Sequence, residues 1–237
     1  AVNPLIFTIA GGVDELLFDL DGASGALTFK SSPNFEIPAD VDGDNVHEIT
    51  LAVSDGTATI EQAVTVTVTD ANDAPTFTLA TIALSAAENQ ISVTVLSATD
   101  EDAGSTLTFS IAGGADEALF DIVGATGVLT FKSSPNFENP ADVGGNNAHK
   151  LTLQVGDGTA TTQQPVTVTV TDVNDAPTFT LATTALGAAE NQISVATVTA
   201  ADEDAGDSLT ITIAGGADEL LFDLDGASGA LTFKSSP

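Results

Sequence analysis

Hydrophobic and polar residues alternate with a period of two along much of the chain. Val64, Val66 and Val68 alternate with threonines, and the same alternation returns at residues 166–171. Because successive side chains of a strand point to opposite faces, this pattern predicts strands with one buried face. No segment of useful length has the 3.6-residue period of an amphipathic helix.

Turn-forming residues separate the expected strands. Residues 16–29 (LLFDLDGASGALTF) predict a strand, a turn that contains Asp-Gly and Ser-Gly, and a second strand. Residues 48–58 (EITLAVSDGTA) predict another strand that runs into a turn. Several short strands in about 100 residues are typical of an all-β, Greek-key β-sandwich of the immunoglobulin-like kind.

The pattern repeats with a fixed period of 102 residues. The segment IAGG begins at Ile9, Ile111 and Ile213, and the segment FKSSP recurs at the same spacing. A unit of this length can fold by itself, unlike the shorter unit of a solenoid. We therefore expect tandem sandwiches: a partial unit at 1–73, a complete unit at 74–175 and a partial unit at 176–237. The partial units and the missing initiator methionine indicate a window on a longer repetitive chain.

The net charge of the chain restricts the classes of partner that we expect it to bind. Four Lys and Arg residues face 34 Asp and Glu residues among 237, so the formal net charge is -30. A hydrophobic fraction of 43% still favours a folded chain over a disordered one. Such a charge disfavours nucleic acid and anionic membranes as partners and favours cations. No apolar run approaches the length of a membrane span, so we expect no membrane insertion.

Acidic residues and asparagines gather at the ends of expected strands, where the loops of a sandwich meet at its poles. The segment TDANDAPTF (69–77) returns as TDVNDAPTF (171–179). Further clusters lie in AAENQ (86–90), ATDEDAG (98–104), PNFE (135–138) and VGDGT (155–159). Calcium takes six to eight oxygen ligands of these types. The absence of cysteine and the presence of only two histidines exclude most softer metals.

In this order, the motifs resemble the cadherin repeat, in the form found in large secreted bacterial adhesins of the RTX/VCBS type. AEN is similar to the family's Glu-Asn motif, and DED is similar to its Asp-X-Asp motif. NFE resembles its Asp-Arg-Glu motif, with asparagine in the place of the aspartate. SDG (54–56) and GDG (156–158) are similar to its late-strand aspartate, and DANDAP resembles its Asp-X-Asn-Asp-Asn linker without the last asparagine. The resemblance covers essentially the whole chain.

The resemblance implies Ca²⁺ between successive units, held by the lower unit, the linker and the upper unit. For the first junction it implies Glu36, Asp70, Asn72, Asp73, Asp100, Asp102 and Asp157. For the second junction it implies Glu88, Glu138, Asp172, Asn174, Asp175, Asp202 and Asp204. Given the asparagine in NFE and the shortened linker, we expect about one to three ions per junction.

Electrostatics favours the same interpretation. Two unit negative charges ~4 Å apart repel by about 4 kcal/mol at an effective dielectric constant near 20. Six carboxylates at one junction would therefore push the units apart unless a cation binds between them. The alternative is a solvated acidic surface, which suits Asp14, Glu15 and Glu61. That alternative does not explain why acids return at equivalent loop positions beside asparagine.

Three other features have simpler explanations. The segment DVDGDN (40–45) resembles a calcium loop, but its counterpart DVGGNN (142–147) has lost most carboxylates, so we expect a turn. His47 and His149 share one equivalent strand position and are expected to be packed or half-exposed strand residues and not metal ligands. Lys30, Lys132 and Lys234 follow a TF segment once in each unit, and we expect each to pair weakly with a nearby carboxylate.

These observations predict a structural protein and not an enzyme, because no nucleophile motif surrounds the two histidines. We expect a calcium-rigidified repeat of a secreted, cell-surface adhesin or filament, whose partners are the neighbouring repeats. The alternative is a calcium-dependent module that binds surface polysaccharide or other copies of itself. Such copies would also be able to polymerise by strand complementation between partial units.

Overall fold

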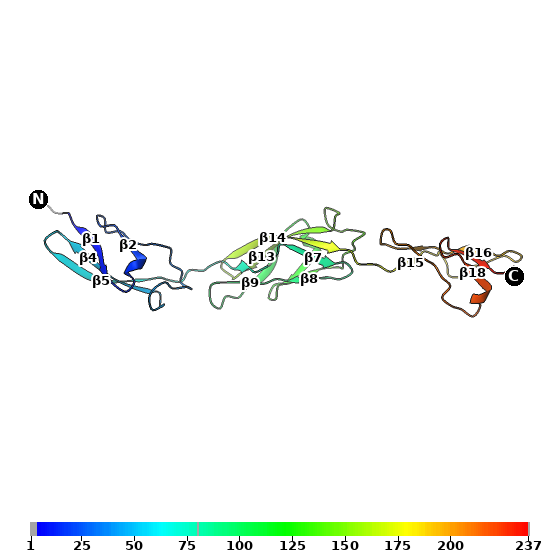
Figure 1. Cartoon of the computed structure of the whole chain (residues 1–237), viewed down its shortest axis with the longest axis horizontal. Helices are drawn as coiled ribbons and strands as arrows, with labels where there is room; N and C mark the ends of the chain where they lie inside the picture. The colour runs from blue at the N-terminus through cyan, green and yellow to red at the C-terminus, as the bar shows by residue number, and fades with distance from the viewer. Residues whose placement is uncertain (1–3, 80, 237) are drawn as a thin grey trace.

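The computed structural model of the chain describes residues 4–79 and 81–236. Its strands form three bodies in a row, with the two termini at opposite ends (Figure 1). Within the described ranges the only helices are three single-turn 3₁₀ helices, η1 (Glu15–Leu17), η2 (Glu117–Leu119) and η3 (Glu219–Leu221). The predicted all-β class is therefore confirmed.

The middle body is a two-sheet sandwich. Its strands are β6 (Thr76–Phe77), β7 (Ala83–Ala87), β8 (Ser92–Val95), β9 (Ala98–Thr99), β10 (Thr108–Gly113), β11 (Phe120–Val123), β12 (Val128–Phe131), β13 (Ala148–Gly156) and β14 (Thr161–Thr171). One sheet has the order β10-β13-β14-β7 and the other has the order β11-β12-β8, while β6 pairs with β9. β7 runs parallel to β14, and the other neighbours in these sheets are antiparallel.

The core of this sandwich follows the alternation of the sequence. Val166, Val168 and Val170 of β14 are 4%, 0% and 1% exposed, and they belong to one cluster with Leu129 and Leu153. Burying a side chain of this size stabilises the fold by about 1.5–3 kcal/mol. The apolar face of the Val/Thr alternation thus forms the core, as the period of two predicts.

The first body has fewer strands, and its apolar face is less covered. It contains β1 (Ile6–Gly11), β2 (Phe18–Leu20), β3 (Leu27–Phe29), β4 (Val46–Ser54) and β5 (Thr59–Thr67), which pair as β1-β4-β5 and as β2-β3. The hairpin expected at 16–29 is present as β2 and β3. Among the described residues no strand pairs with the outer edge of β5, and Val64 and Val66 are half-buried where Val166 and Val168 are buried.

The third body contains β15 (Thr178–Phe179), β16 (Ser194–Thr197), β17 (Ala200–Ala201), β18 (Phe222–Leu224) and β19 (Ala230–Phe233). They pair as β16-β19-β18 and as β15-β17. Residues 210–215 (TITIAG) form no strand, although β10 has the similar sequence TFSIAG. β10 is held by β13, and no described residue supplies that partner in the third body.

His47 and His149 are packed in the core, as expected. Each is 1% exposed. The His149 ring lies edge-on to Phe120 and Phe131, with ring centroids 5.6 and 5.2 Å apart, and His47 has the same arrangement with its own pair of phenylalanines. These rings fill the space between the sheets, and such aromatic pairs add about 0.5–1.5 kcal/mol beyond their buried area.

Candidate metal centre

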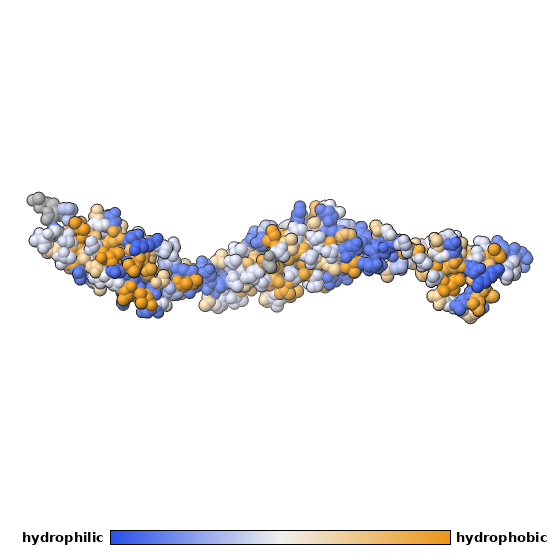
Figure 2. All heavy atoms as spheres, in the orientation of Figure 1, coloured by the Kyte–Doolittle hydropathy of each residue, from blue (hydrophilic) through white to orange (hydrophobic). Residues whose placement is uncertain are grey.

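Two narrow connections join the three bodies. The linkers at residues 68–75 and 172–177 have no strand structure. Each linker passes between an NFE segment of the preceding body and a DED segment of the following body. Hydrogen bonds and carboxylate contacts bring these three segments together. Figure 2 shows hydrophilic residues crowded over the connection between the second and third bodies.

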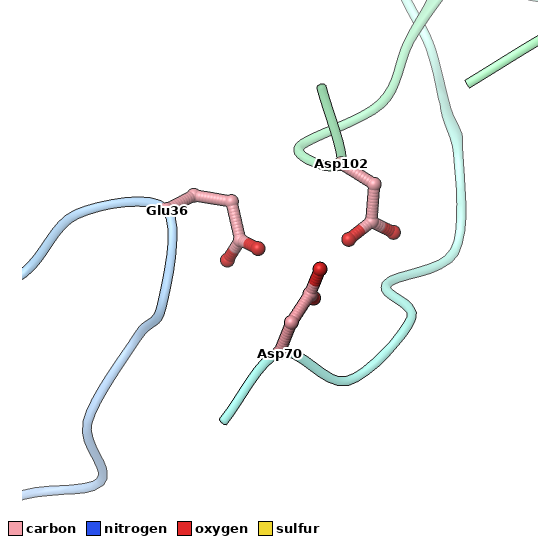
Figure 3. Close-up of side chains that lie close together, drawn as sticks. All are labelled: Glu36, Asp70 and Asp102. Atoms are coloured by element: carbon pink, nitrogen blue, oxygen red, sulfur yellow. The ribbon is translucent and has the colours of Figure 1, made fainter. Parts of the chain in front are cut away.

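Carboxylates from three segments meet at the first junction. Carboxylate oxygens of Glu36, Asp70 and Asp102 lie within 4.8 Å of one another. They come from the first body, the linker and the second body, and they point toward a common space (Figure 3). Asp102 also lies within 4.8 Å of Asp100 and Asp157 in a second cluster, so one carboxylate connects the two.

Hydrogen bonds hold the first linker against the second body. The Asp73 N–H donates to Asp102 Oδ2 at 2.8 Å, and Asn72 Nδ2 donates to Asp157 Oδ2 at 2.9 Å. The Asp102 N–H donates to Asp100 Oδ1 at 2.9 Å. These bonds keep the acidic groups close together despite their mutual repulsion.

The second junction is organised by Glu88, which is 2% exposed. Its Oε2 accepts the Phe137 N–H at 2.8 Å, and its Oε1 accepts the Val173 N–H at 2.9 Å. Glu88 therefore ties the NFE loop to the linker. Carboxylate oxygens of Glu88, Glu138 and Asp172 lie within 4.8 Å of one another.

The rest of the second junction follows the pattern of the first. The Asp175 N–H donates to Asp204 Oδ2 at 2.6 Å, and the Asp204 N–H donates to Asp202 Oδ1 at 3.2 Å. Asn174 Nδ2 donates to the main-chain oxygen of Asp175. The bond between linker and upper body thus recurs at both junctions.

Burial and like charges perturb the carboxylates of the second junction. Desolvation, followed by the charges of Glu88, Asp172 and Asp204, raises the pKa of Glu138. Desolvation and neighbouring carboxylates also raise the pKa of Asp172 and that of Asp175. These shifts mean that the ionised junction is under electrostatic strain.

Asp157 at the first junction behaves in the opposite way. Hydrogen bonds from the N–H groups of Ala160 and Thr159, and then from the side chain of Asn72, lower its pKa. Donors that favour the ionised form have this effect. Asp157 is therefore held as a carboxylate next to Asp100 and Asp102.

The donor set fits a hard divalent cation. Asp100 Oδ2, Glu138 Oε2 and Asp175 Oδ2 are buried without a hydrogen-bond partner. A buried carboxylate oxygen without a donor is unfavourable, and a cation would satisfy it. The oxygens available are those of carboxylates, amides and main chain, which Ca²⁺ prefers at flexible geometry.

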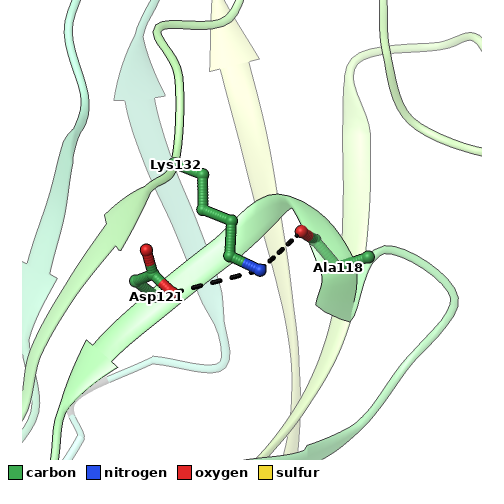
Figure 4. A network of polar contacts seen from close by, with 3 residues as sticks. All are labelled: Ala118, Asp121 and Lys132. Carbon is green, nitrogen blue, oxygen red and sulfur yellow. Dashed lines mark hydrogen bonds and ion pairs between the residues drawn. The ribbon is translucent and has the colours of Figure 1, made fainter.

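The lysines that follow TF make their contacts outside the junction clusters. Lys132 Nζ lies 3.9 Å from Asp121 Oδ1 and donates to the main-chain oxygen of Ala118 at 2.8 Å (Figure 4). Lys234 lies at the same distance from Asp223, and Lys30 donates to the main-chain oxygen of Leu16. The expected pairing is thus present for Lys132 and Lys234.

The DVDGDN loop forms a turn, like its counterpart. Carboxylates of Asp40, Asp42 and Asp44 do lie within 4.8 Å of one another. However, the Asp40 side chain is buried and accepts the N–H groups of Asp44 and Asn45. In the middle body Asp142 makes the equivalent bonds, although that loop lacks the other carboxylates. The turn expected from the sequence is the arrangement that both loops share. Asp14, expected on a solvated surface, is instead 2% exposed, because its carboxylate accepts the N–H groups of Val41 and Glu48.

Every residue predicted for the two junctions lies at them, in the clusters and hydrogen bonds described above. Two further carboxylates at the junctions were not predicted from the sequence, Glu101 and Glu203 at the centre of each DED segment. Their recurrence at the 102-residue period is the signal that would have found them.

The described residues contain no helix that is long and apolar enough to cross a membrane. No protein-family profile matches the chain. Human Protocadherin-23 is 33% identical over an alignment of 244 residues, which covers 95% of this chain and 7% of that protein. The Cadherin EGF LAG seven-pass G-type receptor fmi-1 of Caenorhabditis elegans is 32% identical over 173 residues, or 67% of this chain and 6% of that protein.

Solved structures show the same fold. Mouse cadherin-23 EC22-24 superimposes with a TM-score of 0.59 at 22% identity, covering 100% of this chain and 78% of that one. Mouse Protocadherin-24 EC1-3 gives a TM-score of 0.54 at 21% identity, with the same coverage. The chain thus consists of cadherin-like domains, and the expected Greek-key sandwich is confirmed.

Proposed function

We propose that this chain of cadherin-like domains is a calcium-rigidified structural segment of an extracellular adhesion protein or filament. The observation that carries the proposal is the meeting of Glu36, Asp70 and Asp102 from the lower body, the linker and the upper body. A cation bound by all three would hold both bodies and the linker at once. Ligand binding to one arrangement stabilises that arrangement by mass action.

The residues proposed to bind calcium are those predicted for the two junctions. Bound calcium would supply the positive charge that balances their carboxylates. Asp102 and Asp204 position the linkers by accepting the N–H groups of Asp73 and Asp175, and Glu88 positions the NFE loop of its own body. The proposed units are 1–73, 74–175 and 176–237; residues 1–3, 80 and 237 lie outside the described residues.

The cell-surface location is part of the proposal. The two relatives carry the names protocadherin and cadherin, and the chain spans only 7% and 6% of their lengths. The order of the motifs resembles that of cadherin repeats in large secreted adhesins, and this resemblance supports a place in such a protein. We therefore propose that this segment is secreted, serves adhesion and has a structural role instead of a catalytic one.

Calorimetric titration of the full chain with calcium chloride tests the proposal, combined with X-ray scattering before and after chelation. We expect binding at millimolar calcium or below, and a loss of extension when a chelator removes the ion. An absence of calcium binding at millimolar concentration would contradict the proposed function.

The second candidate function is a module that binds surface polysaccharide or other copies of itself. Exposed apolar side chains on the first body favour it. Val13, Leu16, Ile37 and Val41 are 62%, 76%, 72% and 74% exposed. The Val41 N–H donates to the side chain of Asp14, so the DVDGDN loop and the segment around residue 14 lie side by side. Sedimentation velocity in calcium, with and without soluble polysaccharide, separates the two roles: a monomer that binds no glycan would favour the structural one.

A further inference from the structure

One side-chain hydrogen bond crosses each junction from the NFE segment below to the DED segment above. Asn34 Nδ2 donates to Glu101 Oε2 at 2.9 Å, and Asn136 Nδ2 donates to Glu203 Oε2 at 2.5 Å. In both cases the two residues are 67 positions apart. The Asn–Glu hydrogen bond is therefore a repeated feature of the two junctions.

The asparagine is oriented by its own loop. Asn34 Oδ1 accepts the Ile37 N–H at 2.7 Å, and Asn136 Oδ1 accepts the Asn139 N–H at 2.5 Å. With the oxygen engaged in this way, the NH₂ group is the part of the amide that faces the upper body. An aspartate would present only acceptors here and would repel the glutamate.

The glutamate held by this bond faces other carboxylates. Carboxylate oxygens of Glu101, Glu36 and Asp73 lie within 4.8 Å of one another. At the second junction the charge of Glu203 contributes to the raised pKa of Asp175, after burial and the charges of Glu88 and Asp204. Both glutamates thus lie close to the linker aspartate of their junction.

We propose that Glu101 and Glu203 are additional cation-binding residues of the two junctions, each oriented by the asparagine of the preceding NFE segment. This inference rests on the proposed function. Each such site would combine carboxylates from the lower body, the linker and the upper body. Its affinity would therefore depend on how the two bodies are arranged.

The test uses calorimetric calcium titration of the full chain carrying Glu101→Gln and Glu203→Gln. Glutamine keeps an oxygen that can accept from the asparagine, but it has no charge. We expect the variant to bind fewer ions, or to bind its weakest class of ions at least tenfold less tightly. Glu61→Gln together with Glu117→Gln is the matched control, because both glutamates are exposed, and it should titrate like the wild type.

A second variant separates positioning from direct binding. Asn34→Ala with Asn136→Ala leaves both glutamates but removes the groups that orient them, so we expect a smaller loss of affinity, of about threefold. If the glutamine variant keeps the stoichiometry and affinity of the wild type, the pair is only a cross-link and the inference is overturned. If the wild type binds no calcium at all, the proposed function fails first and the inference falls with it.

Discussion

Asp102 contributes its carboxylate to two clusters and accepts a hydrogen bond from the linker. With the proposed cation bound, loss of this one charge would weaken both clusters. At the scale of single residues, we therefore expect calcium binding to depend on a few shared carboxylates and not on the overall acidity of the surface.

The change Asp102→Asn tests this dependence. Asparagine can still accept the Asp73 N–H, but it removes one negative charge from both clusters. We expect calcium affinity at the first junction to fall by about tenfold or more, which corresponds to ~1.4 kcal/mol. Calorimetric titration measures the effect, with Asp19→Asn on the exposed face of β2 as the control. Equal affinity in the two variants would contradict the assignment.

The raised pKa values of Glu138, Asp172 and Asp175 predict a pH dependence. An acid whose pKa is raised on folding contributes stability below its unfolded pKa, and this stability is lost as the pH rises through the folded pKa. Without metal, ionisation therefore opposes the ordered second junction. Calcium needs the ionised form, so its binding should release protons as the pH approaches these pKa values from above.

The expected result is greater proton release per calcium in mildly acidic buffer than at neutral pH, with weaker binding at the lower pH. Calorimetry in two buffers with different ionisation enthalpies measures the protons released. Asp157 should not contribute, because its pKa is lowered. Binding heats that are independent of the buffer in the mildly acidic range would count against a role for the three carboxylates.

At the scale of elements, the approach of β10 to β13 depends on a glycine. The register between the two strands shifts between Ile111 and Gly113. At Gly114, φ is +120°, and a Cβ atom would lie 2.4 Å from the main-chain oxygen of Lys150. Gly12 has the same close approach in the first body, 2.4 Å from the main-chain oxygen of Glu48.

The change Gly114→Ala should therefore destabilise the middle body by about 3 kcal/mol or more, since backbone strain adds to the clash. Differential scanning calorimetry in calcium measures the loss as a lowered transition temperature. The control is Gly187→Ala, where no heavy atom lies within 4 Å of the added Cβ. A transition unchanged by Gly114→Ala would show that β10 can move away from β13 at little cost.

Local sequence predicted some of the elements but not all of them. The alternation around Val166 and the hairpin at 16–29 were recognisable because period and turn residues are local signals. The segments 108–113 and 210–215 are similar in sequence, yet only the first forms a strand. Its partner β13 begins 40 residues later in the chain (148 − 108 = 40), and no described residue supplies an equivalent partner for 210–215. Local sequence does not contain this information. The predicted junction residues followed from motifs in a fixed order. Glu101 was missed because its orientation depends on an amide 67 residues earlier, in another body.

At the scale of the whole molecule, part of the net charge of -30 lies in carboxylate clusters where the bodies meet. Screening by salt acts mainly between exposed charges that are more than about 8–10 Å apart at physiological ionic strength. The clustered carboxylates lie within 4.8 Å of one another, and several of their oxygens are buried. Monovalent salt should therefore replace calcium only in part.

X-ray scattering tests this expectation on the metal-free chain. We expect 0.5 M sodium chloride to restore less than about half of the extension that calcium gives, because screening reduces repulsion but does not bridge the bodies. Sodium chloride at the same concentration, added to the calcium-loaded chain, is the control and should change the scattering little. Full recovery of extension by salt alone would mean that general repulsion, and not a bound ion, sets the shape.

The parallel pairing of β7 with β14 has a mechanical consequence. The chain enters the middle body at β6, which pairs with β9, and leaves it just after β14. β7, the strand that follows β6, is paired with β14 at five positions from Thr167 with Ala83 to Thr171 with Ala87. A pull on the two ends would draw parallel strands in opposite directions. The load would then fall on all the hydrogen bonds of this pair together, in shear, instead of breaking them one after another.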